Sequence, residues 1–268
     1  MKRRPFLQKI SLLSSVAVAL PLTSFGKDLP FRAPRLKFIT ASDGHFGQPD
    51  TDYTSSHNNL MNAINKEENV DFVVFNGDLI HDEPAFMPQV KTFYDKLNSP
   101  YYVSRGNHDK VSSQVWEEIW GTKEDHAFQT KDGSGVILLS ASNEEGEYLC
   151  GNVDFLKSKL DSFTSLSHVF VFIHISQKEW TRHGIECAAL INLIAQYPNV
   201  KATFHGHDHD VDGIMLDQKK PYLWSGHFGG SWGNPFPSYR VCEISEEGKT
   251  ITYLKSVKEG TVLNAHLL

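Results

Sequence analysis

Apolar runs and amphipathic stretches alternate along the first three quarters of the chain. The runs "RLKFITASD", "VDFVVFNGD", "PYYVSRGNHD", "SHVFVFIH" and "VKATFHGHDH" are short, and their apolar positions are nearly continuous. This is typical of strands that are covered on both faces. Stretches with helical periodicity lie between them, namely "SHNNLMNAINKEE", "PAFMPQVKTFYDKL", "SSQVWEEIW", "VDFLKSKLDSF" and "IECAALINLIAQY". The alternation predicts an α/β fold in which parallel strands are joined by helices.

Two regions depart from this alternation. "HAFQTKDGSGVILLSASN" carries Asp-Gly-Ser-Gly between two strand-like runs, which predicts an antiparallel hairpin. After Val211, strand-like segments such as "SYRVCEIS" and "TITYLKSV" follow with turn signals and no helical pattern. Neither an internal repeat nor a linker divides the chain, so we expect a single domain over residues 27–268.

The first 26 residues have the pattern of an export signal. A basic start, "MKRRPFLQK", precedes the interrupted apolar run "ISLLSSVAVALPL" and the small residues of "TSFG". "RRPFL" followed by Lys9 is similar to the twin-arginine signal, which predicts an exported, periplasmic or extracellular protein. An ordinary secretory signal and an uncleaved anchor are the alternatives. The apolar run is too short for a comfortable membrane span. Once the signal is removed, we expect no stable membrane span.

Net charge narrows the range of binding partners, and cysteine content limits the number of disulfides. The formal net charge is −6, and it becomes −10 without residues 1–26, which hold four basic residues and no acid. An acidic protein of this kind disfavours a nucleic-acid polymer as partner, whereas a small phosphorylated substrate stays possible. Cys150, Cys187 and Cys242 allow one disulfide and a leftover thiol, or three buried thiols. Oligomeric state stays open.

Residues that can bind metal follow five of the predicted strands. Because open α/β sheets place their ligands at the carboxyl ends of strands, we expect these side chains to converge. Within each Asp-x-His or His-x-His pair, an extended backbone would point both members to one side. The donors are oxygen and imidazole nitrogen without thiolate, which suits Mn, Fe or Zn and not a structural zinc knot. They are Asp43, His45, Asp78, Asn107, His174, His207 and His209.

The ordered series "SDGH", "NGD", "GNHD", "VFIH" and "GHDH" resembles the calcineurin-like metallophosphoesterase superfamily, from about Ile39 to His209. The resemblance implies a two-sheet αββα sandwich with flanking helices and two divalent ions at the carboxyl ends of the strands. It also implies two ligand sets that share Asp78 as a bridge. The first set is Asp43, His45, Asp78 and His209, and the second is Asp78, Asn107, His174 and His207.

The resemblance also assigns the two residues that follow Asn107. His108 would face the substrate and protonate the leaving oxygen, and Asp109 would orient His108. The implied reaction is attack of a metal-bridging hydroxide on a phosphodiester. Purple acid phosphatases carry a metal-binding tyrosine three residues beyond the Asp of Gly-Asp, where this chain has His81. That branch is therefore disfavoured, and the cyclic-nucleotide and glycerophosphodiester phosphodiesterases are the nearest branch.

Two other functions use the same residues. A phosphomonoesterase or pyrophosphatase would need the same centre, and a metal-binding scaffold without activity would need the ligands but no proton donor at His108. Specificity is expected in loops that border the strand ends, among them "SQKEWTRHG" and "HFGGSWGNPFPSY". In these loops Trp180, Trp232 and Phe236 could stack on a base or sugar, or could serve only as packing lids.

Overall fold

The computed structural model describes residues 31 and 33–268. The chain divides into two units, residues 1–32 and 33–268, and the fold described below is that of the second. The predicted export signal, residues 1–26, lies outside the described residues. The predicted start of the domain at residue 27 lies there as well, so both stay predictions.

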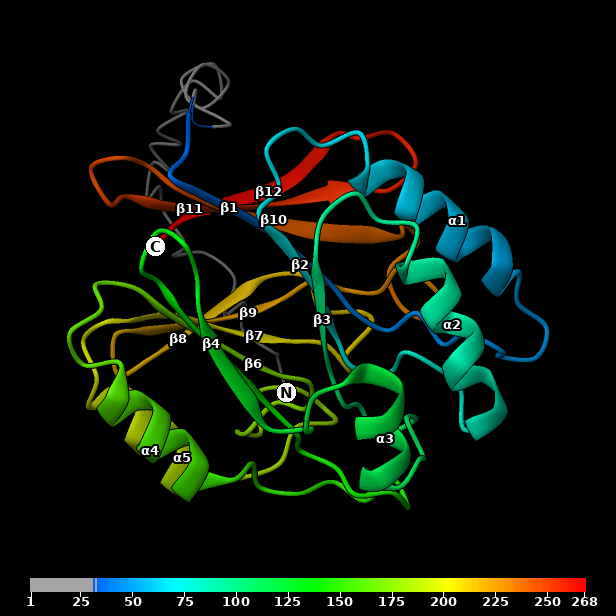
Figure 1. Cartoon of the computed structure of the whole chain (residues 1–268), viewed down its shortest axis with the longest axis horizontal. Helices are drawn as coiled ribbons and strands as arrows, with labels where there is room; N and C mark the ends of the chain where they lie inside the picture. The colour runs from blue at the N-terminus through cyan, green and yellow to red at the C-terminus, as the bar shows by residue number, and fades with distance from the viewer. Residues whose placement is uncertain (1–30, 32) are drawn as a thin grey trace, which may run out of the picture. The chain divides into compact units, whose positions relative to one another are not determined.

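Residues 33–268 contain two six-stranded sheets (Figure 1). The first has the strand order β12-β11-β10-β1-β2-β3, and the second has the order β4-β5-β6-β7-β9-β8. Strands β1, β2 and β3 run parallel to one another, and so do β5, β6, β7 and β9. The strands of the first sheet are β1 (Leu36–Ala41), β2 (Phe72–Asn76), β3 (Tyr101–Ser104), β10 (Ser238–Ile244), β11 (Thr250–Ser256) and β12 (Val262–Leu267). Those of the second are β4 (His126–Gln129), β5 (Gly135–Leu139), β6 (Val169–Ile173), β7 (Val200–His205), β8 (Ile214–Asp217) and β9 (Lys220–Trp224).

Alternate residues of each buried strand enter two different cores. In β6, Phe170 and Phe172 pack between the sheets against side chains of the first sheet such as Phe38, whose ring centroid lies 4.9 Å from that of Phe170. Val169 and Val171 point the other way, into a core that includes helical residues. Successive side chains of a strand alternate between its faces, so a strand covered on both sides is apolar at nearly every position.

Helices cover the outer faces of the sandwich (Figure 1). On the first sheet, the ring of Phe75 in β2 stacks on Tyr94 of α2 with centroids 3.6 Å apart. On the second, α4 and α5 bury leucines and isoleucines such as Leu156 and Ile194 against the sheet. The helices are α1 (Tyr53–Ile64), α2 (Met87–Tyr94), α3 (Ser113–Trp120), α4 (Val153–Ser162) and α5 (Ala188–Ala195), with a 3₁₀ turn, η2 (Pro84–Phe86), before α2.

The predicted αββα sandwich is confirmed, including the hairpin β4–β5. One strand was missed. β12 pairs with β11 at the edge of the first sheet, and Val262 and Leu267 are 48% and 70% exposed. An edge strand that is covered by no helix does not need a continuous apolar run, so its pattern is weak.

The structure decides between the two alternatives for the cysteines. Cys150 and Cys187 form a disulfide that joins the loop before α4 to the start of α5, and Cys242 is a buried free thiol. None of the helices in the described part of the chain is long and apolar enough to cross a membrane.

Candidate metal centre

The predicted ligands lie at the carboxyl ends of five parallel strands, three in one sheet and two in the other. In the first sheet, Asp43 and His45 follow β1, Asp78 follows β2 and Asn107 follows β3. In the second, His174 follows β6, and His207 and His209 follow β7. Hydrogen bonds across the sandwich join these ends, since the His174 ring bonds the carbonyl of Asn76 and the His207 amide donates to Asp43.

The backbone at these ends turns sharply instead of continuing the strands. Asp43, His45, Asp78 and His207 have φ values of 60°, 45°, 52° and 68°, in the left-handed region that residues other than glycine rarely adopt. The expectation that each Asp-x-His or His-x-His pair projects from extended backbone was therefore wrong. Such conformations cost free energy and persist where the surrounding structure holds them, as at binding sites.

Two glycines allow the strand ends to approach one another. A Cβ atom on Gly77 would lie 2.4 Å from the His174 ring, and the φ of +84° is itself unfavourable for other residues. A Cβ atom on Gly106 would lie 2.2 Å from the backbone nitrogen of Asp78. Any larger residue at either position would push the strand ends apart.

Six of the predicted ligands form two buried groups, each with donor atoms within 4.8 Å of one another. One group is Asp43, His45 and His209, and the other is Asp78, His174 and His207. The Oδ2 atom of Asp78 lies between them, 3.6 Å from Nε2 of His45 and 3.2 Å from Nε2 of His174. This is the position that a bridging carboxylate would need.

Hydrogen bonds at Nδ1 orient three of the imidazoles. Nδ1 of His174 lies 2.7 Å from the Asn76 carbonyl oxygen, and Nδ1 of His209 lies 3.1 Å from that of Trp232. Nδ1 of His45 lies 3.1 Å from Nδ1 of His81. A carbonyl can only accept, so His174 and His209 carry a proton on Nδ1, and Nε2 is the ring atom that each turns toward the cluster.

Buried atoms without partners show that the cluster fits cations. Within the described residues, Asn107 Oδ1 and His207 Nε2 are buried and have no hydrogen-bond partner. The Nε2 atoms of His45 and His209 face each other at 2.9 Å. Buried polar atoms normally find partners, and lone pairs that converge from several imidazoles and carboxylates would find one in a divalent ion. The residues therefore fit a dinuclear divalent metal centre.

The family model for calcineurin-like phosphoesterases matches residues 36–211, which hold all of these strand ends. The chain belongs to this family. Its fold and motifs make it a metal-dependent phosphoester hydrolase, as the sequence resemblance predicted. No curated protein sequence matches the chain.

Solved structures share the fold at low sequence identity. A dimetal phosphatase from Danio rerio has a TM-score of 0.69 and 14% identity, over 87% of this chain and 99% of that one. A purple acid phosphatase from yellow lupin has a TM-score of 0.66 and 13% identity, over 87% of this chain and 53% of that one. An NAD nucleotidase from Haemophilus influenzae has a TM-score of 0.52 and 10% identity, and 50% of its chain is covered.

The electrostatics of this calcineurin-like phosphoesterase favour charged carboxylates. Burial raises the pKa of Asp43, but His209 and His174 outweigh burial and bring it down to about 2. Burial lowers the pKa of His174, but the Asp78 and Asp43 carboxylates outweigh it and raise that pKa to about 10. The carboxylates thus attract a proton onto His174, and a divalent cation would satisfy the same negative charge.

His108 and Asp109 were predicted to act together, and the structure places them apart. The Asp109 carboxylate is fully buried and accepts from the backbone amides of Leu79, Ile80 and Gly106 at 2.8–3.0 Å. It therefore joins the loops after β2 and β3, and the expectation that it orients His108 was wrong. Both of its carboxylate oxygens accept from backbone amides, Oδ1 from Leu79 and Ile80 and Oδ2 from Gly106.

Asp82 is the residue that orients the His108 ring. Its Oδ1 lies 2.9 Å from Nδ1 of His108 and 2.9 Å from Nζ of Lys110. The His81 ring stacks on the His108 ring with centroids 4.8 Å apart. Asp82 lies only four residues beyond Asp78, but sequence reasoning missed it, because its approach to His108 depends on how the two loops meet.

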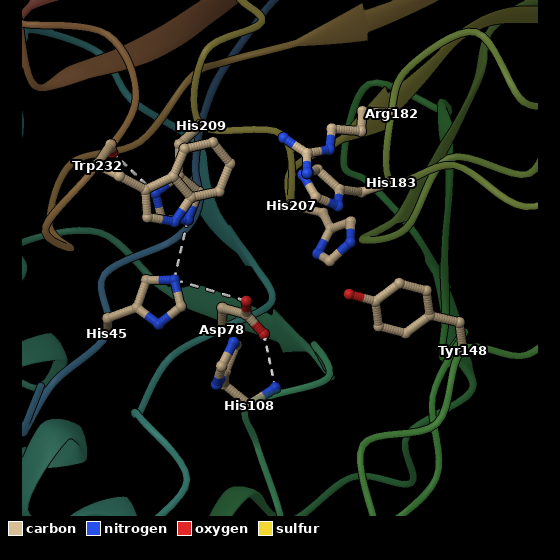
Figure 2. Close-up of a pocket in the computed structure, with 9 residues that line it drawn as sticks. All are labelled: His45, Asp78, His108, Tyr148, Arg182, His183, His207, His209 and Trp232. Atoms are coloured by element: carbon tan, nitrogen blue, oxygen red, sulfur yellow. Dashed lines mark hydrogen bonds and ion pairs between the residues drawn. The ribbon is translucent and has the colours of Figure 1, made fainter.

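A cavity of about 380 Å³ opens over the cluster (Figure 2). One of its walls is formed by residues outside the metal-binding motifs. Tyr148, Arg182 and His183 line that wall, and Trp232 lies over the ring of His209 at 4.3 Å. Trp180 instead packs on Tyr222 with ring centroids 4.6 Å apart, so it is the packing lid of the two alternatives. Arg182 and His183 belong to the loop "SQKEWTRHG", which was predicted to border the site, but neither residue was predicted individually. No motif or spacing in the sequence pointed to Tyr148.

Proposed function

We propose that this calcineurin-like phosphoesterase is an exported phosphodiesterase that binds two divalent ions, Mn, Fe or Zn, and acts on a small phosphorylated substrate. Asp43, His45, Asp78 and His209 would hold one ion, and Asp78, Asn107, His174 and His207 the other. One observation supports this assignment above all. The Oδ2 atom of Asp78 lies within 3.6 Å of the His45 imidazole in one buried group and of the His174 imidazole in the other.

In this proposal the chain binds the phosphoryl group at the cluster and moves one proton. Two divalent ions, when bound, neutralise phosphate charge and lower the pKa of a coordinated water. His108 lines the cavity, and Asp82 holds its Nδ1, so that Nε2 can give a proton to the departing oxygen.

A diester is favoured by the complete motif series with "GNHD", which is similar to the phosphodiesterase branch. The same centre would also hydrolyse a phosphomonoester or a pyrophosphate, because in this proposal the metal ligands and His108 act on a single phosphoryl group. A scaffold without activity would need neither the cavity nor the contact between Asp82 and the His108 ring, so this alternative is disfavoured.

Turnover of p-nitrophenyl esters by stripped and reloaded protein tests this proposal. We expect the chelated protein to be inactive, and Mn, Fe or Zn to restore hydrolysis of bis-p-nitrophenyl phosphate in excess of p-nitrophenyl phosphate, with about two ions bound per chain. Preference for the monoester would establish the alternative activity. Two bound ions without any turnover would establish the scaffold.

Export is the part of the proposal that rests on residues outside the described structure. The Cys150–Cys187 disulfide supports it, because disulfides persist in oxidising compartments. We expect replacement of Arg3 and Arg4 by Lys to trap the precursor in the cytoplasm, as measured by fractionation and immunoblotting. Unchanged export of this variant would favour the ordinary secretory route.

A further inference from the structure

Two loops build the wall of the cavity that lies outside the metal motifs. Tyr148 comes from the loop between β5 and α4, and Arg182 and His183 come from the loop between β6 and α5 (Figure 2). The Tyr148 ring lies edge-on to the His207 ring with centroids 4.8 Å apart, and that of His183 lies 5.6 Å from it. This wall therefore adjoins the His207 side of the cluster, whereas His108 lies on the other side (Figure 2).

The two loops are fastened to each other. The disulfide between Cys150 and Cys187 closes them together, and the buried Gln177 side chain accepts from the Gly151 amide at 2.8 Å. Within the second loop, the Cys187 amide donates to the Gln177 carbonyl at 3.0 Å. Arg182 is thus carried by a loop that is held at both ends, so its place at the cavity does not depend on a free segment.

Arg182 is the arginine without a partner among those that the structure describes. The guanidinium of Arg35 bonds Asp132 and His168, that of Arg105 bonds Glu124, and that of Arg240 bonds the Trp224 carbonyl. Within residues 33–268, no hydrogen bond or ion pair engages Arg182, and Figure 2 shows its guanidinium directed into the cavity. A guanidinium fork matches the oxygens of phosphate and carboxylate groups.

We propose that Arg182 is a specificity-determining residue that binds a second negative charge of the substrate, where the substrate has one beyond the single charge of a simple diester. The inference rests on the proposed function, because the reacting phosphoryl group must lie at the cluster. The second charge has two possible sources, a monoester oxygen on the same phosphorus or a further phosphate group elsewhere on a diester. Both present anionic oxygens to the guanidinium.

Four substrates with the same p-nitrophenolate leaving group test the proposal. Bis-p-nitrophenyl phosphate carries one charge, and p-nitrophenyl phosphate adds a second on the same phosphorus. The p-nitrophenyl ester of thymidine 5′-phosphate and the same ester with an added 3′-phosphate form a matched pair for a remote charge. We would measure kcat/KM for wild type, Arg182→Ala, Arg182→Lys and Lys131→Ala, whose exposed lysine lies outside the cavity lining.

We expect Arg182→Ala to lower kcat/KM by about 10- to 100-fold for the monoester, for the 3′-phosphorylated ester, or for both. The substrates that lose rate identify the source of the charge. Bis-p-nitrophenyl phosphate should change less than about threefold, Arg182→Lys should be intermediate, and Lys131→Ala should match wild type. An equal loss on all four substrates, or no loss on any, would overturn the proposal. Absence of turnover by wild type would instead refute the proposed phosphoesterase function.

Discussion

Asp78→Ala should lose both metal ions and lower turnover by at least about 10³-fold, the largest effect that we expect from any single substitution. The Asp78 carboxylate is buried, with Oδ2 between the His45 and His174 imidazoles, so its removal takes a ligand from each half of the centre. In contrast, His45→Ala should mainly weaken one ion. Metal content per chain, measured after gel filtration in metal-free buffer, is the readout.

A milder substitution, Asp78→Asn, separates the effect of removing the charge from the effect of removing the side chain. Asp78 Oδ1 also accepts from the His108 amide at 2.9 Å, so Ala could disturb the loop after β3 as well as the metals. Asp78→Asn keeps an oxygen for that amide but removes the negative charge. We expect it to retain the fold, as judged by circular dichroism, and still to bind less metal. Two full ions in both variants would defeat the bridging assignment.

His108→Ala should keep both ions and lower turnover by about 10²- to 10⁴-fold on esters with alkoxide leaving groups, the usual scale of general-acid catalysis. His108 lines the cavity and belongs to neither of the two buried groups, although its ring lies in a third, less buried group with His45 and His81. A p-nitrophenolate leaves without a proton, so the loss should be much smaller on p-nitrophenyl esters. The comparison of alkyl and p-nitrophenyl esters of one phosphate measures this difference.

The two neighbouring carboxylates provide matched variants for this test. Asp82→Asn weakens the partner of the His108 ring, so it should reproduce part of the dependence on the leaving group. Asp109→Asn alters the contacts to three backbone amides and should lower thermal stability without that dependence. Equal impairment of His108→Ala on both kinds of ester would mean that His108 stabilises charge on the phosphoryl oxygens. Loss of metal would make His108 a ligand.

The pattern of the sequence was enough to predict an α/β fold and the convergence of its strand ends, and the family resemblance implied the two-sheet sandwich. Strands such as β2 and β6 are apolar at nearly every position because both faces are covered, and this signal is local. The carboxyl ends of parallel strands in one sheet share one edge, so Asp43 after β1 and Asp78 after β2 could be expected to meet. His174 follows β6 in the other sheet, so its approach to Asp78 was implied by the family resemblance. Periodicity, topology and the family resemblance together therefore sufficed for the position of the predicted centre.

Only the tertiary structure decided which side chains touch. Asp82 and not Asp109 contacts the His108 ring. Tyr148 and Arg182 line the same cavity, on two loops that a disulfide joins. Loop conformation depends on contacts from the rest of the fold, here buried amides, a disulfide and left-handed residues such as Asp43 and His207. No short pattern in the chain encodes those contacts, whereas a strand can be recognised from the alternation of its own side chains between two faces.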